Sequence, residues 1–257
     1  MFALRHGATA PAVRAALTGT FTRTDVPRLR HELDTLLSTG RPVILDVSRA
    51  TAAFPPAVEV LARTLLAAGG WPAARLVVAG PDARFRAALR STGTIRDVVV
   101  VDDVEQAAAR LGDRPERVRR RLALRPGTAE RRARDLVDRG GAEWDVLHLF
   151  ADARRITGQL VRAARGPSVL TITLGEEGLR IALRDFDPRR RQVPAAGGRA
   201  SSWGVTPRSD GNVAWALLAA QACVRLHLSL SGWSNFSSDQ HVPPGVARKI
   251  RPPLRAK

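Results

Sequence analysis

The chain has 257 residues and a formal net charge of +17, with 44% hydrophobic and 25% charged residues. These proportions exclude a wholly disordered chain, and a single cysteine excludes an internal disulfide framework. No apolar run reaches the ~20 residues of a membrane-spanning helix, and residues 1–20 show no signal-peptide pattern. We therefore expect a cytoplasmic protein with no membrane contact.

Positive charge is unevenly distributed along the chain. Residues 1–112 hold 14 Arg and 10 acidic residues, whereas the remainder holds 27 basic and 14 acidic residues. The change occurs at residues 113–115 and predicts a domain boundary after residue 112, followed by an Arg-rich linker over 113–127. Because the excess charge is positive, nucleic acid is an alternative partner.

Short apolar runs alternate with segments of helical spacing in residues 1–112. Apolar residues recur every three to four positions in the second kind of segment, and β-branched residues dominate the first. The predicted strands are 12–21, 43–47, 75–79 and 97–101, and the predicted helices are 26–37, 58–68, 82–91 and 104–111. This alternation predicts an α/β domain with helices packed on the sheet.

Residues 128–233 have a different order of elements, with helices first and strands afterwards. Helices are predicted over 128–139 and 144–164, strands over 169–174, 179–185 and 212–218, and a loop over 192–207. This order predicts an α+β two-layer domain. The Pro- and Ser-containing segment 234–257 is predicted to be a disordered tail.

Several short motifs of residues 1–112 occur in the order and spacing of one known family. They are Gly19-Thr20-Phe21, the strand from Pro42 to Ser48, the strand and turn from Leu76 to Pro81, the helix end from Leu89 to Gly93, and the helix start from Asp102 to Ala107. On these motifs the domain resembles a STAS domain, the fold of anti-sigma factor antagonists. The resemblance implies a protein partner of the anti-sigma type.

The resemblance also implies a working loop after the strand that contains Asp46. The family has Asp-Ser-Ser-Gly there, and a partner kinase phosphorylates one serine, which adds about two negative charges and breaks the interface. The corresponding residues here are Phe54, Pro55, Pro56 and Ala57, which carry no hydroxyl. With Thr51, they are predicted to form a partner-binding surface that phosphorylation does not switch. The alternative is a simple helix start with a core Phe.

The second domain resembles a degenerate histidine-kinase-type (GHKL) ATPase of the anti-sigma serine kinase kind. The motifs are the helix from Ala129 to Val137, the helix end from Leu160 to Pro167, the hairpin end from Leu183 to Pro188, and the segments Trp203-Gly204-Val205 and Gly211 to Trp215. The resemblance places a remnant nucleotide site at Arg155, Gln159, Asp185 and Gly198.

The remnant site lacks the groups that phosphoryl transfer needs. Arg155 stands where the family has a general-base Glu, and a guanidinium stays protonated. Gln159 replaces an Asn that would hold magnesium. Asp185 is retained as the residue that would read adenine, and the glycine-rich loop is shortened around Gly198. We therefore predict no catalytic residue and no bound cofactor, with ATP and magnesium as an alternative ligand. The five histidines and one cysteine form no metal-ligand pattern.

Together these features predict a non-catalytic regulator of a sigma-factor partner-switching pathway that acts by protein–protein binding. The second domain is expected either to cover the STAS surface within the same chain or to offer positive charge to an acidic partner. Two alternatives are an ATP-binding serine kinase of the anti-sigma type and a basic nucleic-acid-binding module.

Overall fold

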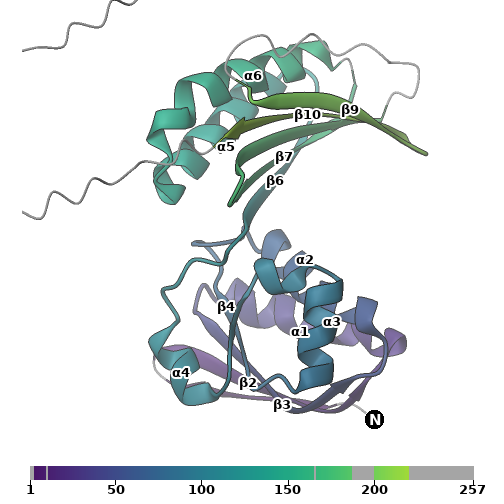
Figure 1. Ribbon diagram of the computed structural model, residues 1–257, viewed down its shortest axis with the longest axis vertical. Helices are drawn as coiled ribbons and strands as arrows, with labels where there is room; N and C mark the ends of the chain where they lie inside the picture. Colours follow the sequence, from purple (N-terminus) through teal and green to yellow (C-terminus); the bar gives the residue numbers. More distant parts are fainter. Residues whose placement is uncertain (1–2, 10, 165, 187–199, 220–257) are drawn as a thin grey trace, which may run out of the picture. The chain divides into compact units, whose positions relative to one another are not determined.

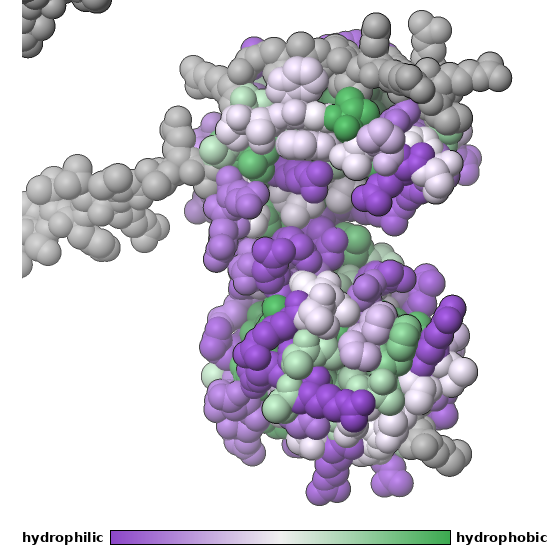
Figure 2. Space-filling model, turned by 45° about the vertical axis from the view of Figure 1, so that its right-hand side comes forward, coloured by the Kyte–Doolittle hydropathy of each residue, from purple (hydrophilic) through white to green (hydrophobic). Residues whose placement is uncertain are grey.

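The computed structural model describes residues 3–9, 11–164, 166–186 and 200–219. The described residues form two five-stranded sheets, each carrying its own helices (Figure 1). The predicted tail 234–257 and Gly198 lie outside the described residues. The surface drawn in Figure 2 is largely hydrophilic, with small apolar patches between charged side chains.

The first sheet has the order β1-β2-β3-β4-β5. Its strands are β1 (Ala3–Thr9), β2 (Ala12–Phe21), β3 (Val43–Ala52), β4 (Leu76–Ala79) and β5 (Val99–Val101). β1 and β2 form an antiparallel hairpin, and every further neighbouring pair in the sheet is parallel. The predicted α/β architecture with a mixed sheet is therefore confirmed, and β1 is an additional strand that the sequence did not indicate.

Helices cover the two faces of this sheet unequally. Its helices are α1 (Val26–Ser38), α2 (Glu59–Ala67), α3 (Ala83–Ser91) and α4 (Val104–Ala109). The apolar sides of α1, α2 and α3 share one buried cluster with the inward residues of β2, β3 and β4. α4 packs on the opposite face, where Ala107 joins a smaller cluster with Ile44 and Val77. The part of that face over β1, β2 and β3 consequently carries polar side chains.

The second sheet is antiparallel throughout and has the order β6-β7-β8-β10-β9. Its strands are β6 (Val118–Leu124), β7 (Ser168–Gly175), β8 (Gly178–Asp185), β9 (Ser202–Arg208) and β10 (Gly211–Ala219). Burial alternates along β7 and β8 because only one face packs against α5 (Ala129–Trp144) and α6 (Phe150–Ala163). The second half thus has two layers, a sheet and two helices, but β6 precedes the helices that were predicted to come first, and the likeness to a GHKL ATPase stays a prediction.

Several boundaries differ from the sequence-based predictions, and the strand predicted over 43–47 continues as β3 to Ala52. The segment predicted as an Arg-rich linker contains β6. The helix predicted over 144–164 is interrupted, because α5 continues to Trp144 and Asp145 then adopts a left-handed conformation (φ 54°) before α6 begins at Phe150. The loop predicted over 192–207 includes most of β9, which pairs with β10.

A carboxylate and two guanidiniums hold the start of β6. Asp97 is 6% exposed and accepts hydrogen bonds at 2.7 Å from both Nε and Nη2 of Arg117. Arg119 Nη2 donates to the same carboxylate at 2.5 Å. The hydrogen bonds that Arg117 donates to Asp97 raise the pKa of Arg117, whereas burial lowers the pKa of Arg119. The bidentate geometry of Arg117 gives its pairing with Asp97 a defined orientation.

Candidate protein-docking site

The predicted partner-binding residues lie where β3 passes into α2. The β2–β3 ladder continues to the pair Phe21–Ala52, and the amide of Ala53 donates to the carbonyl of Phe21 at 3.0 Å. A short 3₁₀ helix (Pro55–Val58) follows, and the amide of Ala57 donates to the carbonyl of Phe54 at 2.9 Å. Two prolines fit this turn because the first amides of a helix need no intrahelical acceptor.

We name residues 53–56 the docking loop. All four are exposed, and the side chain of Phe54 is 39% exposed. Ala57 and Val58, which follow, are 3% and 0% exposed and anchor the loop in the core. The alternative prediction of a core Phe at position 54 is therefore wrong. The docking loop offers an aromatic ring and two rigid prolines on a buried support.

Thr51 lies outside the docking loop. It is half-buried within β3, where it pairs with Thr20 of β2.

Residues 53–58 contain no hydroxyl, amide or charged side chain, and the first charged group beyond them is Glu59, which forms an ion pair with Arg63 on α2. The docking loop is therefore suited to apolar contact with a protein surface and contains no side chain that accepts a phosphoryl group.

The residues predicted as a nucleotide-site remnant are not gathered in one cavity of the described chain. Arg155 lines a cavity of about 230 Å³ between α5 and α6, but neither Gln159 nor Asp185 lines it. Arg155 is exposed and donates to Asp152 at 3.0 Å. Gln159 is half-buried on α6, and its Oε1 has no hydrogen-bond partner among the described residues.

Asp185 occupies a structural position at the end of β8. It is 8% exposed and pairs with Ser168 of β7 on one side and Asn212 of β10 on the other. The backbone is tightly packed there, since a Cβ added to Gly211 would lie 2.0 Å from the Asp185 carbonyl oxygen. Asp185 is therefore part of the closely packed end of this strand ladder.

The described residues contain no group of three or more His, Cys, Asp or Glu that could hold a metal ion. None of the helices in the described ranges is long and apolar enough to span a membrane.

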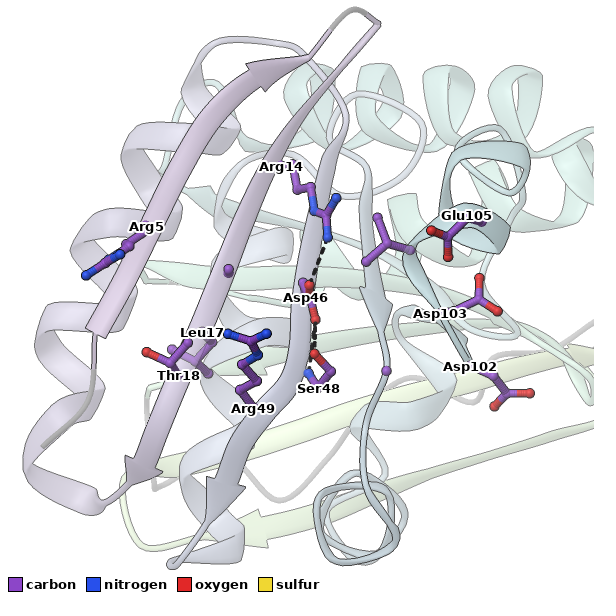
Figure 3. A pocket seen from close by; sticks show the side chains of 13 residues that line it. Arg5, Arg14, Leu17, Thr18, Asp46, Ser48, Arg49, Asp102, Asp103 and Glu105 are labelled. Carbon is purple, nitrogen blue, oxygen red and sulfur yellow. Dashed lines mark hydrogen bonds and ion pairs between the residues drawn. The ribbon is translucent and has the colours of Figure 1, made fainter.

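The sequence reasoning missed one site, a polar groove on the first sheet (Figure 3). It has a volume of about 800 Å³ and lies on the face opposite α1, α2 and α3. Asp46 lies at its centre, and its carboxylate accepts from the Ser48 amide at 3.0 Å, the Ser48 hydroxyl at 2.7 Å and Arg14 at 3.1 Å. Burial raises the pKa of Asp46, but these hydrogen bonds outweigh burial and lower it below its ordinary value.

One signal in the sequence does point to this groove. Arg14, Ala16 and Thr18 alternate with the buried residues of β2, and Asp46 and Ser48 do the same on β3. Polar residues at every second position of two neighbouring strands indicate a face without a complete apolar cover.

No protein family matches this chain, and no curated protein matches it. An anti-sigma factor antagonist from Mycobacterium paratuberculosis is similar in structure with 14% identity, over 44% of this chain and 96% of that one, with a TM-score of 0.40. The unphosphorylated anti-sigma factor antagonist SpoIIAA has 21% identity over 43% of this chain and 95% of its own, with a TM-score of 0.34. The phosphorylated form of SpoIIAA from Bacillus has 21% identity over 43% and 98%, with a TM-score of 0.32. These likenesses are partial, and no partner of this chain follows from them.

Proposed function

We propose that this chain is a non-catalytic regulator that binds a protein of the anti-sigma type through its docking loop, within a sigma-factor partner-switching pathway. The observation that carries this proposal is the exposed sequence Phe54-Pro55-Pro56 at the start of α2. STAS domains, which the first domain resembles, have their phosphorylatable serine at this position. Because proline has no oxygen for a phosphoryl group, the chain would remain in its partner-binding state whatever the kinase activity.

The second domain is proposed to contribute no catalysis. A general base must be able to take up a proton, and the guanidinium of Arg155 is already fully protonated. The ion pair between Arg155 and Asp152 also supports the absence of a general base. In the GHKL ATPases, which the second domain resembles, the position of Arg155 carries a free carboxylate. We expect this domain to act through its surface charge and through its covalent link to the first domain.

A direct test uses a purified kinase-type anti-sigma factor from the same genome as the binding partner. We expect it to bind the full chain in biolayer interferometry, and the substitution Phe54→Asp to weaken binding at least tenfold. A charge in the docking loop would have to be desolvated in the interface.

Leu147→Asp is the matched control. Leu147 is 63% exposed and lies in the second domain, so the same chemical change there is expected to leave binding within twofold of the wild type. Unchanged binding of Phe54→Asp, or loss of binding in Leu147→Asp alone, would place the interface elsewhere and refute the proposal.

A further inference from the structure

The polar groove on the first sheet has walls of opposite charge. Arg5, Arg14 and Arg49 lie on one side, and Asp102, Asp103 and Glu105 lie on the other (Figure 3). The floor between them consists of small or short side chains from β2 and β3 together with Gly80. A volume of about 800 Å³ is within the usual range of small-ligand sites.

A β-bulge turns the basic wall toward the groove. Ala16 pairs with Asp46, but Thr18 pairs with Arg49, so β3 has one residue more than β2 over this stretch. Bulges of this kind redirect side chains, and here Ser48 and Arg49 both line the groove. The bulge therefore places a guanidinium where regular alternation would place it on the other face.

Two of the three arginines are available to a ligand. Arg14 is engaged with Asp46 at 3.1 Å. Arg5 and Arg49 make no hydrogen bond or ion pair with any of the residues that the structure describes. Arg5 extends outward from the edge strand, whereas Arg49 lies over the groove floor beside Ser48 (Figure 3), so the unengaged guanidinium of Arg49 suits a carboxylate or another planar anion.

The acidic wall also contains a carboxylate that is available to a ligand. Asp103 caps α4 by accepting from the Gln106 amide at 2.7 Å, and Asp102 accepts from Arg86 at 2.6 Å while remaining 77% exposed. Glu105 has no hydrogen-bond or ion-pair partner within the described ranges. Glu105, supported by the exposed Asp102, is thus available to a cationic group.

Sheet geometry sets the separation of the two walls. Arg5 lies on β1, four strand spacings from β5, but Arg49 lies on β3, which is two spacings or about 10 Å from β5, the strand that the acidic residues follow. An extended peptide advances about 3.3–3.6 Å per residue, so three or four residues span that separation. A free amino acid is too short to reach both walls.

We propose that this groove binds a short peptide with free termini, with its carboxylate at Arg49 and its ammonium group at Glu105. The ligand would lie across the strands over the small side chains of the floor. This site is separate from the docking loop, because it lies on the face of the sheet opposite the helices that carry the loop.

The test uses tetraglycine as the probe and the full chain labelled with ¹⁵N. We expect tetraglycine, titrated to about 10 mM, to shift the amide resonances of β2, β3 and the start of α4. Blocking either terminus, as N-acetyl-tetraglycine or tetraglycine amide, should weaken binding at least fivefold. Arg49→Glu and Glu105→Lys should each weaken it about tenfold.

Arg84→Glu is the matched control, because Arg84 is exposed on α3 beyond the groove, and it should bind tetraglycine as the wild type does. Phe54→Asp should also leave peptide binding unchanged, which separates this proposal from the docking function. The absence of shifts in these elements would overturn the proposal. So would binding of inorganic phosphate that Glu105→Lys strengthens, because the groove would then be a simple anion site.

Discussion

Asp97 neutralises two arginines at the point where the chain enters the second sheet. Its side chain is 7% exposed, while those of Arg117 and Arg119 are 23% and 31% exposed. Removing one member of a partly buried ion network leaves the remaining charges desolvated without a counter-charge. We predict that Asp97→Asn lowers the free energy of unfolding by about 2–3 kcal/mol, measured by urea denaturation.

Asp102→Asn provides the comparison for that substitution. The side chain of Asp102 is 77% exposed although it also pairs with an arginine. Exposed ion pairs contribute little to stability, so Asp102→Asn should lower the free energy of unfolding by less than about 0.5 kcal/mol. Equal effects of the two substitutions would mean that the Asp97 network does not stabilise the fold.

The Ser48 hydroxyl strengthens a pH-dependent contribution of Asp46 to the stability of the fold. Because the pKa of Asp46 is lower in the folded chain than the unfolded value of about 3.9, its ionised form stabilises the fold above that pH. This contribution is lost as the pH falls through the folded pKa. Ser48→Ala removes one hydrogen bond to the carboxylate and moves the folded pKa back toward the ordinary value.

We therefore predict that Ser48→Ala is less stable than the wild type at pH 7 and that the difference narrows at pH 3. Urea denaturation at both pH values measures this. A difference that is constant or larger at pH 3 would show that the hydroxyl acts by some means other than the Asp46 charge.

Gly141 allows the two helices of the second domain to pack closely. A Cβ at this position would lie 1.8 Å from Cε2 of Phe150, the first residue of α6. Overpacking of this kind costs about 1–3 kcal/mol, so Gly141→Ala should lower the thermal midpoint of the second domain by several degrees.

Gly158→Ala is the control for this effect. Gly158 lies in α6, and its nearest neighbour for a Cβ is the flexible end of Arg162 at 3.3 Å. Alanine favours the helix by up to about 1 kcal/mol, so this substitution should leave the midpoint unchanged or raise it. Calorimetry of both variants measures the contrast, and destabilisation by Gly158→Ala alone would contradict the assigned packing.

Elements with clear periodicity were predictable, and those that depend on long-range contacts were not. The helix over 26–37 and the strand over 43–47 follow from local apolar spacing. β6 was missed because three consecutive arginines interrupt its apolar residues, although Val118 and Leu124 are buried and Arg120 pairs with Glu143 of α5. The break at Asp145 was missed because the apolar spacing continues through it.

The candidate sites differ in the same way. The position of residues 53–56 was expected from the resemblance to STAS domains, because they are consecutive and follow Asp46 along one strand, and their binding of a partner stays a prediction. The groove was not expected, because its walls come from β1, β2, β3 and the start of α4, which only the sheet order brings together. Pairing of β1 with β2 places Arg5 in the groove, and β1 was not predicted.

The proposed function separates the two domains, with partner binding proposed for the first and no phosphoryl transfer proposed for the second. The described part of the chain places Arg155 in an ion pair and Asp185 within a strand ladder. We predict that the purified protein with ATP and magnesium releases no phosphate above a no-protein blank. Steady turnover that is lost in Asp185→Asn would contradict this assignment.

The proposed function requires that the docking loop bind a kinase-type anti-sigma protein and that phosphorylation not release it. The most direct measurement follows the complex with the purified kinase from the same genome during incubation with γ-labelled ATP and magnesium, and again with ADP. We predict that the complex dissociates at equal rates in ATP and in ADP and that no phosphate label is transferred to this chain. Faster dissociation in ATP accompanied by labelled peptides from this chain would contradict it.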